Sequence, residues 1–225
     1  MKKLLLPILL FSQFSYAQIG LWSDAGITKK WNKKQQTTFS LGERQNIGVG
    51  FDRLFFDLNH QYQVYDGIQI VGAYRIALNE KGDQLRLQTD LLSHRFQIGM
   101  KVSILDLLDF GPKRLELTWL SRQQWGFQVG KPMGNLWRNR LSLSYDIKNS
   151  PFSPCISAEH FYSWNTSTIN PNTGALTNGS TIQWRYFMGF GIELPQKQSL
   201  KFQFGFRNRA NGSQALLRAS YAIQL

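Results

Sequence analysis

The chain has 225 residues, of which 42% are hydrophobic and 14% aromatic, and its formal net charge is +12 at pH 7. So many aromatic residues exclude a disordered chain, and Cys155, the single cysteine, excludes a disulfide scaffold. Beyond the N-terminal segment there is no apolar run of about 18 residues, the length that a transmembrane helix requires. These exclusions leave an all-β protein.

The first segment of the chain, Met1 to Ala17, has the pattern of a secretory signal peptide. Lys2 and Lys3 form a basic start, residues 4–11 are apolar, and Ser15-Tyr16-Ala17 is a small-x-small cleavage motif. The apolar stretch is too short to span a bilayer as a helix. We therefore expect an exported protein, cleaved after Ala17, whose formal charge falls from +12 to +10 because two lysines are removed.

Hydrophobic and polar residues alternate with a period of two through most of the remaining chain, which indicates β-strands. In the clearest segment, Ile182 to Leu194, the residues between the apolar positions include Gln183, Arg185 and Glu193. Similar segments cover residues 54–59, 68–78, 137–147, 200–207 and 217–225. The segments 68–78, 137–147 and 217–225 have about the 9–11 residues of a tilted transmembrane strand.

A soluble β-sandwich also alternates, with its apolar face packed into a core and its polar face solvated. Here the apolar face is too large and too aromatic for one core of this length, and the polar face is rich in Arg, Gln, Ser and Gly. Aromatic residues gather toward the strand ends, as in the girdles of outer-membrane barrels: Tyr62, Tyr65, Trp119, Trp125, Trp137, Trp164 and Trp184. We therefore expect a closed antiparallel transmembrane β-barrel in the outer membrane.

The last strand supports this interpretation, because its alternate apolar residues continue to the terminal carboxylate. Tyr221, Ile223 and Leu225 are the expected signal for the barrel-assembly machinery. The last residue of such proteins is usually aromatic, and Leu225 departs from that pattern.

Turn signals rich in Gly, Pro, Asn and Asp give the number of strands. Between Leu85 and Ile104 the apolar parity switches, which indicates either a turn or a β-bulge near Ser93-His94. A turn gives twelve strands and a bulge eleven, while ten result if the first segment lies outside the barrel. Because single-chain bacterial barrels have even strand numbers, we expect twelve, with both termini periplasmic and a long extracellular loop over residues 165–180.

The strand parity also assigns charged side chains to the barrel interior. The expected inward basic residues are Arg44, Arg53, Arg75, Arg86, Lys101, Arg114, Arg122, Arg138, Arg140, Arg185, Lys201, Arg207 and Arg218. The expected inward acidic residues are Asp57, Asp90, Glu116, Asp146, Glu159 and Glu193. One interpretation is an ion-paired filling of the lumen, and the other is a basic surplus that attracts anions.

Short motifs in order along the mature chain resemble a known family. They are Trp22, Gly42-Glu43-Arg44, Gly72-Ala73-Tyr74-Arg75, Leu85-Arg86-Leu87, the segment 137–141 (WRNRL) and the segment 157–162 (SAEHFY). This order is similar to the outer-membrane barrels grouped as domain of unknown function 2490. The resemblance covers the mature chain, is poorer over Lys113 to Val129, and implies an outer-membrane barrel without an established activity or catalytic residues.

Two functions remain open for such a barrel. The first is a narrow channel for small anionic solutes. The second is a structural or accessory barrel of an envelope complex, with a lumen plugged by side chains. A bilayer conductance measurement separates them.

A lipid-modifying enzyme is a third alternative, but we expect no catalysis. His60, His94 and His160 are scattered, and neither Ser93-His94 nor Ser157 to His160 has the motif of a barrel hydrolase. No residues have metal-ligand spacing, so no metal or other cofactor is expected. The expected partners are outer-membrane lipid, lipopolysaccharide and the assembly machinery; the protein is expected to be a monomer that does not bind nucleic acid.

Overall fold

The computed structural model describes residues 18–47, 50–79, 92–109, 111–112, 114–128, 131–169, 176–209 and 212–225. The expected signal peptide and the expected lumen residues Arg86 and Asp90 lie outside these ranges.

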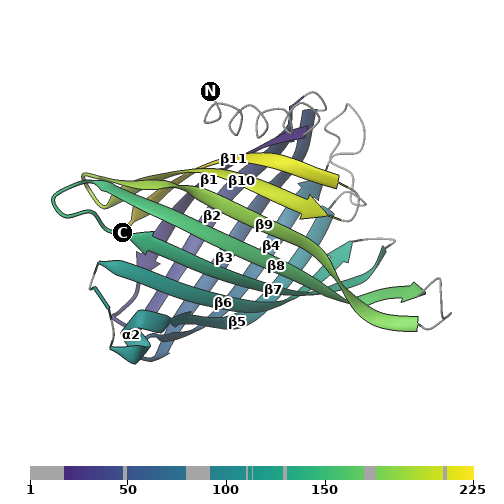
Figure 1. Ribbon diagram of the computed structural model, residues 1–225, viewed down its shortest axis with the longest axis horizontal. Helices are drawn as coiled ribbons and strands as arrows, with labels where there is room; N and C mark the ends of the chain where they lie inside the picture. Colours follow the sequence, from purple (N-terminus) through teal and green to yellow (C-terminus); the bar gives the residue numbers. More distant parts are fainter. Residues whose placement is uncertain are drawn as a thin grey trace, which may run out of the picture.

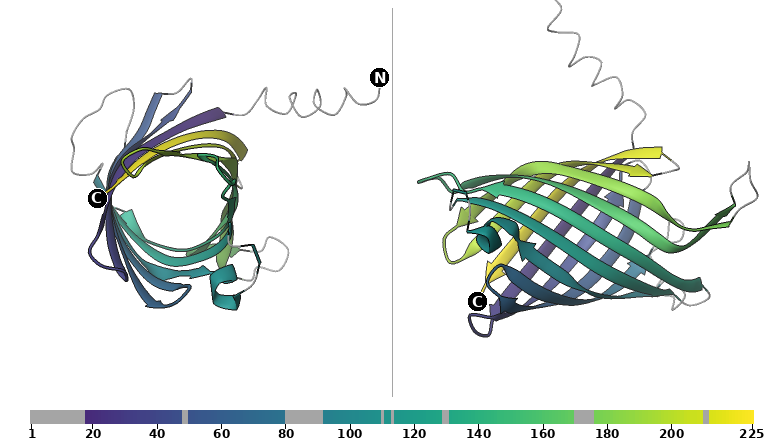
Figure 2. Two further views of the ribbon diagram at one scale, coloured as in Figure 1. Left: turned by 90° about the vertical axis from the view of Figure 1, so that its left-hand side faces the viewer. Right: turned by 60° about the horizontal axis from the view of Figure 1, so that its bottom comes forward.

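The described residues form one closed β-barrel of eleven strands, which confirms the predicted fold class (Figure 1). The strands are β1 (Gln18–Lys30), β2 (Gln35–Asn46), β3 (Gly50–Tyr65), β4 (Ile68–Asn79), β5 (Leu92–Ser103), β6 (Leu115–Gln128), β7 (Lys131–Tyr145), β8 (Phe152–Ile169), β9 (Leu176–Leu194), β10 (Gln198–Arg209) and β11 (Gly212–Gln224). A short helix, α2 (Ile104–Leu108), lies between β5 and β6. Viewed from its end, the ring of strands is continuous (Figure 2, left).

The described barrel therefore has eleven strands rather than the expected twelve. β4 pairs directly with β5 from Ile68 opposite Val102 to Leu78 opposite Leu92, so no other strand stands between them. The residues expected to form the additional strand, 85–91, lie outside the described ranges. Ser93 and His94, where a turn or bulge was expected, pair regularly within β5.

The odd number of strands determines how the barrel closes. Each strand runs antiparallel to the next, so the first and the last strand must run parallel, and β1 pairs with β11 in this way from Gln18 opposite Gln214 to Thr28 opposite Gln224. The start of β1 and the end of β11 therefore lie at opposite rims, which we call the N-terminal and the C-terminal rim. The expectation that both termini share the periplasmic side is wrong for this topology.

The described parts of the expected long loop over residues 165–180, which are 165–169 and 176–180, are strand, and residues 170–175 lie outside the described ranges. β8 continues to Ile169 and β9 begins at Leu176, and the two remain paired at Ser167 opposite Asn178. This hairpin projects beyond its neighbours at the N-terminal rim (Figure 1).

The two faces of the barrel wall differ in polarity, as the sequence alternation predicts. Large apolar side chains of alternate positions remain exposed on the outside, among them Leu54, Phe56, Phe96, Ile98, Leu141, Ile156, Tyr186, Met188, Phe202, Phe204 and Leu217. The buried residues include Gln97, Gln124, Glu159 and Arg185. The outside of the wall is thus apolar, whereas the interior combines polar and charged side chains with apolar ones such as Phe187 and Leu216.

No helix in the described ranges is long and apolar enough to cross a membrane.

Glycines on the inner face make room for large inward side chains on the neighbouring strand. Gly205 stands opposite Phe187, whose ring lies over the glycine, and Gly42 stands opposite Phe55 in the same way. A Cβ atom at either glycine would overlap the ring. The rings can therefore lie flat against the wall inside the barrel, where they flank the charged residues.

Candidate functional site in the lumen

Contacts between strands that are not neighbours show which side chains fill the interior. The guanidinium of Arg185 on β9 lies 5.1 Å from the ring centroid of Trp22 on β1, and the rings of Trp22 and Phe187 are 6.0 Å apart. β10 and β11 separate β9 from β1 in the wall. These contacts therefore pass through the lumen.

Glu159 on β8 is the centre of the largest ion-pair cluster. Its side chain is almost inaccessible to solvent, with a residue exposure of 2%. Oε1 accepts a hydrogen bond from Arg138 Nη2 at 2.5 Å, and the guanidinium groups of Arg185 and Arg140 approach the carboxylate to 3.6 and 3.8 Å. Because β7, β8 and β9 are adjacent, the carboxylate joins three strands through one buried charge.

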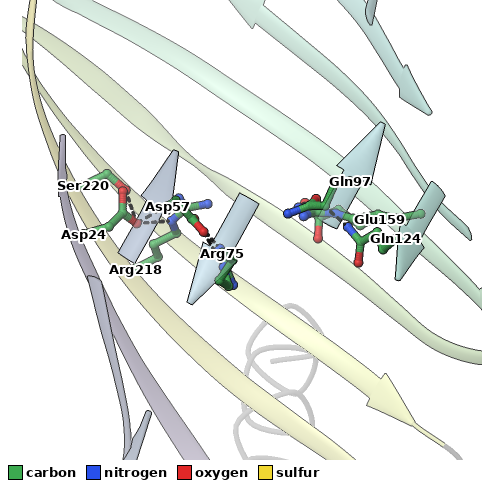
Figure 3. A network of polar contacts seen from close by, with 9 residues as sticks. Asp24, Asp57, Arg75, Gln97, Gln124, Glu159, Arg218 and Ser220 are labelled. Atoms are coloured by element: carbon green, nitrogen blue, oxygen red, sulfur yellow. Dashed lines mark hydrogen bonds and ion pairs between the residues drawn. The ribbon is translucent and has the colours of Figure 1, made fainter. Parts of the chain in front are cut away.

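Two further carboxylates bind one arginine each (Figure 3). Asp57 on β3 accepts two hydrogen bonds from Arg75 on β4, from Nε and Nη2, both at 2.5 Å. Asp24 on β1 accepts hydrogen bonds from Nε and Nη2 of Arg218 and from the hydroxyl of Ser220, both on β11. The second group spans the parallel junction of the barrel.

Aromatic rings hold several of the arginines in place. The guanidinium of Arg44 lies 4.2 Å from the ring centroid of Trp22, and that of Arg75 lies 4.1 Å from the centroid of Phe55. The guanidinium of Arg185 lies 4.3 Å from the centroid of Phe161. Such cation–π contacts favour a fixed position of the charge and do not neutralise it.

These groups surround a central cavity of about 170 Å³. Among its lining residues are three carboxylates (Asp24, Asp57 and Glu159) and seven arginines (Arg44, Arg75, Arg122, Arg138, Arg140, Arg185 and Arg218). With all of these groups ionised, the described lining carries four more positive than negative charges.

Two of the seven arginines contribute to this excess without a described carboxylate partner. Within the described ranges, neither Arg44 nor Arg122 has a carboxylate oxygen within 4 Å, and the Nε atom of each is buried without a hydrogen-bond acceptor. Buried guanidinium groups of this kind are sites where an anion gains charge-assisted hydrogen bonds.

The other expected lumen residues lie nearer the rims. Lys101 pairs with Glu116 at 3.7 Å, and Arg207 donates a hydrogen bond to Gln214. Arg114 precedes β6 at the C-terminal rim, where the exposed residues Glu193, Asp146 and Lys201 also lie. Arg53 lines a separate cavity.

Sequence reasoning missed two charged lumen residues. Arg95 shares the parity of Gln97 on β5 and lines the cavity near Arg53, but it lies next to the expected break at Ser93-His94. Asp24 lies on β1, for which no inward face was predicted, although it is two residues from Trp22 and therefore shares its face. Once the bounds of β1 and β5 are known, the alternation of side chains along each strand identifies both residues as inward-facing. Glu43, which precedes Arg44 on β2, belongs to the outer face and accepts hydrogen bonds from Ser23 and Gln45.

The expected assembly residues alternate along β11 and just beyond it. Ser220 points to Asp24 in the lumen, so the adjacent Tyr221 points outward, where its hydroxyl donates to Gln198. Ile223 shares the parity of Tyr221, and Leu225 follows the end of the strand with its side chain exposed.

The three histidines lie on different strands, β3, β5 and β8, and each contacts a neighbouring side chain. Nδ1 of His94 is 2.7 Å from the hydroxyl of Tyr74, and Nδ1 of His60 is 2.9 Å from the hydroxyl of Thr37. The ring of His160 packs on Trp184 at 4.5 Å. No group of three His, Cys, Asp or Glu residues suited to a metal ion occurs in the part of the chain that the structure describes.

No family model and no curated protein matches the chain. Among solved structures, the barrel is similar to one described as the NanC porin, with a TM-score of 0.52, 11% sequence identity, and coverage of 91% of this chain and 95% of that chain. A second structure, described in connection with the in-meso crystallisation of membrane proteins, has a TM-score of 0.41, 10% identity and coverage of 89% of this chain and 79% of that chain, too low a score to support an argument. The likeness to the porin shows the fold: the chain is a porin-like closed β-barrel.

Proposed function

We propose that the protein is an outer-membrane β-barrel whose lumen conducts small anions. The apolar outer face and the charged interior support a membrane position, because each Arg or Lys facing lipid near the midplane would cost about 2–4 kcal/mol. The observation that carries the anion preference is the lining of the central cavity, with seven arginines against three carboxylates.

The physical basis of the preference is the field in a narrow, low-dielectric lumen. Fixed positive charges within such walls focus the potential along the axis and raise the local concentration of anions. The carboxylates neutralise only part of the guanidinium charge, since Arg44 and Arg122 have no carboxylate within 4 Å among the described residues. An entering anion therefore meets hydrogen-bond donors that no described carboxylate occupies.

The test is a reversal potential in planar bilayers under a KCl gradient. We expect discrete channel openings and a reversal potential whose sign shows that chloride is more permeant than potassium. The preference for anions is expected to weaken as added salt shortens the Debye length below about 10 Å. Replacing Arg138 and Arg140 by Gln is expected to reduce the preference. The matched control replaces Lys33 and Lys34, which lie in the exposed turn between β1 and β2, and is expected to leave it nearly unchanged. A cation-selective pore contradicts the proposal.

A second candidate is a structural or accessory barrel with a plugged lumen. The observation that favours it is the filling of the interior: Trp22, Phe187 and Leu216 form a buried apolar cluster inside the wall, and the central cavity is only about 170 Å³. Such a barrel stays silent in bilayers at every voltage, so the conductance experiment separates the two candidates.

The proposal includes export, location and partners. Cleavage after Ala17 gives a mature protein that begins at Gln18, and N-terminal sequencing of the protein from the outer-membrane fraction tests this. Recovery from the soluble periplasm with Met1 retained contradicts it. The lipid-facing wall is proposed to contact outer-membrane lipid and lipopolysaccharide, with the barrel a monomer, assembled through its C-terminal strand and either independent or part of an envelope complex.

The resemblance to domain of unknown function 2490 belongs to the same proposal and supplies no established activity. The proposed role is passive, and no residue is assigned to catalysis. A lipid-hydrolase assay on the purified folded barrel tests this, because release of fatty acid above the level of a denatured control contradicts a purely passive barrel.

A further inference from the structure

A second lumen cavity, separate from the central one, lies toward the N-terminal rim and has a volume of about 120 Å³. Its lining includes Arg53 on β3, Arg75 on β4 and Arg95 on β5, together with Ser93, Gln128 and the apolar residues Ala77 and Phe127. None of its described lining residues is acidic. Three guanidinium groups from three adjacent strands thus border one small space.

The strand register brings these charges together in pairs of like sign. Arg75 stands directly opposite Arg95, and Arg44 stands directly opposite Arg53. Like charges at directly opposed positions of an antiparallel pair destabilise the sheet. Asp57 compensates Arg75 through Nε and Nη2 of that arginine. Arg95 has no carboxylate oxygen within 4 Å among the described residues.

We propose that this cavity is a binding site for a phosphate group, either inorganic phosphate or the phosphate of a small monoester. This proposal rests on the proposed function, because it makes the cavity a binding site along the same path of anions through the lumen. Guanidinium groups bind phosphate bidentately through paired N–H donors. Ser93, whose hydroxyl accepts a hydrogen bond from Asn79 and donates one to the Ala77 carbonyl, and Gln128 also line this cavity.

The geometry favours a tetrahedral anion over a carboxylate. Guanidinium groups on three strands present N–H donors from several directions, and a phosphate offers up to four oxygens where a carboxylate offers two. The space is adequate as well: since one water occupies about 30 Å³ of the liquid, a cavity of about 120 Å³ has room for an anion with four oxygens.

The test is equilibrium binding of inorganic phosphate to the folded barrel in non-ionic detergent, measured by calorimetry at constant ionic strength. We expect saturable binding, with a Kd raised at least tenfold in Arg95→Gln. The matched control, Arg114→Gln, removes the same charge at the opposite rim and is expected to change the Kd less than twofold. Arg95→Lys keeps the charge but loses the paired donors, and its Kd is expected to lie between those of the wild type and Arg95→Gln.

Competition experiments define the chemistry of the ligand. Acetate at the same concentration is expected to displace little phosphate, and displacement equal to that by phosphate itself overturns the assignment to a phosphate group. Methyl phosphate that binds as tightly as inorganic phosphate identifies a monoester site, and methyl phosphate that binds at least tenfold more weakly identifies a site for the free ion. Both results support the proposal.

Folding controls and a conductance measurement distinguish failure of the phosphate site from failure of the variants to fold and from failure of the proposed channel function. Each variant is checked by the different gel migration of folded and heat-denatured barrel, and if Arg95→Gln does not fold, the Arg95→Lys and wild-type comparison decides. No saturable binding, or equal binding by wild type and Arg95 variants, overturns the site. Anion-selective current without phosphate binding overturns this inference alone, whereas phosphate binding to a barrel without conductance overturns the channel and leaves the site.

Discussion

Replacing Glu159 by Gln is the most direct test of the central lumen network. The carboxylate is buried and pairs with Arg138 at 2.5 Å, Arg185 at 3.6 Å and Arg140 at 3.8 Å. The substitution keeps the shape of the side chain but leaves three guanidinium groups of adjacent strands without their shared counterion. Removing one partner of a buried ion pair costs about 3–5 kcal/mol, because the remaining charge stays buried and uncompensated.

We expect Glu159→Gln to lose about 3 kcal/mol of unfolding free energy, the lower end of this range, since the Gln oxygen still accepts a hydrogen bond from Arg138. The assay is urea unfolding of the barrel refolded in lipid vesicles, followed by tryptophan fluorescence. The control is Glu193→Gln, an exposed carboxylate near the C-terminal rim, for which a change within about 0.5 kcal/mol is expected.

The same variant has a second, opposite consequence for the channel. Loss of one carboxylate raises the positive excess at the central cavity, so anion preference is expected to rise while stability falls. Equal stability of Glu159→Gln and Glu193→Gln refutes the argument that Glu159 compensates buried charge. A lower anion preference in Glu159→Gln refutes the argument that net lumen charge sets selectivity.

Three further outcomes test the packing, the register and the closure of the barrel. Gly205→Ala is expected to lower the free energy of unfolding in urea by about 1–3 kcal/mol, because its Cβ would overlap the Phe187 ring. The control is Gly72→Ala, whose Cβ would have no atom within 4 Å. Equal losses of unfolding free energy in the two variants contradict this packing. Tyr221→Asp is expected to prevent assembly of the barrel, which is measured as loss of the heat-modifiable gel band. Gln224→Asp, at the opposite parity, is expected to reduce assembly much less. The same loss of assembly at both positions shows that the register is incorrect. Asp24→Ala removes the acceptor of three hydrogen bonds across the parallel junction. It is expected to lower the free energy of unfolding by about 1.5–3 kcal/mol in the same assay. An unchanged urea midpoint shows that this contact does not hold the first and last strands together.

The sequence alone predicted which residues face inward on most strands, but it missed Asp24 on β1 and Arg95 on β5. Alternation is a local property of the chain, because successive side chains of an extended strand point to opposite sides. The outward positions of Phe56, Met188 and Phe202 and the inward positions of Arg138 and Arg185 follow from this period. The barrel class follows too, since so large an apolar face needs a surrounding other than water.

The tertiary structure decided how many strands close the ring and which charges meet inside it. The strand count depends on the direct pairing of β4 with β5 and on the parallel pairing of β1 with β11, neither of which alternation can specify. The meeting of Arg185 with Trp22 and of Arg75 with Arg95 likewise depends on strand register and closure. The physical reason is that alternation fixes only the direction of a side chain, whereas the partner it meets is set by backbone hydrogen bonds between segments far apart in the chain.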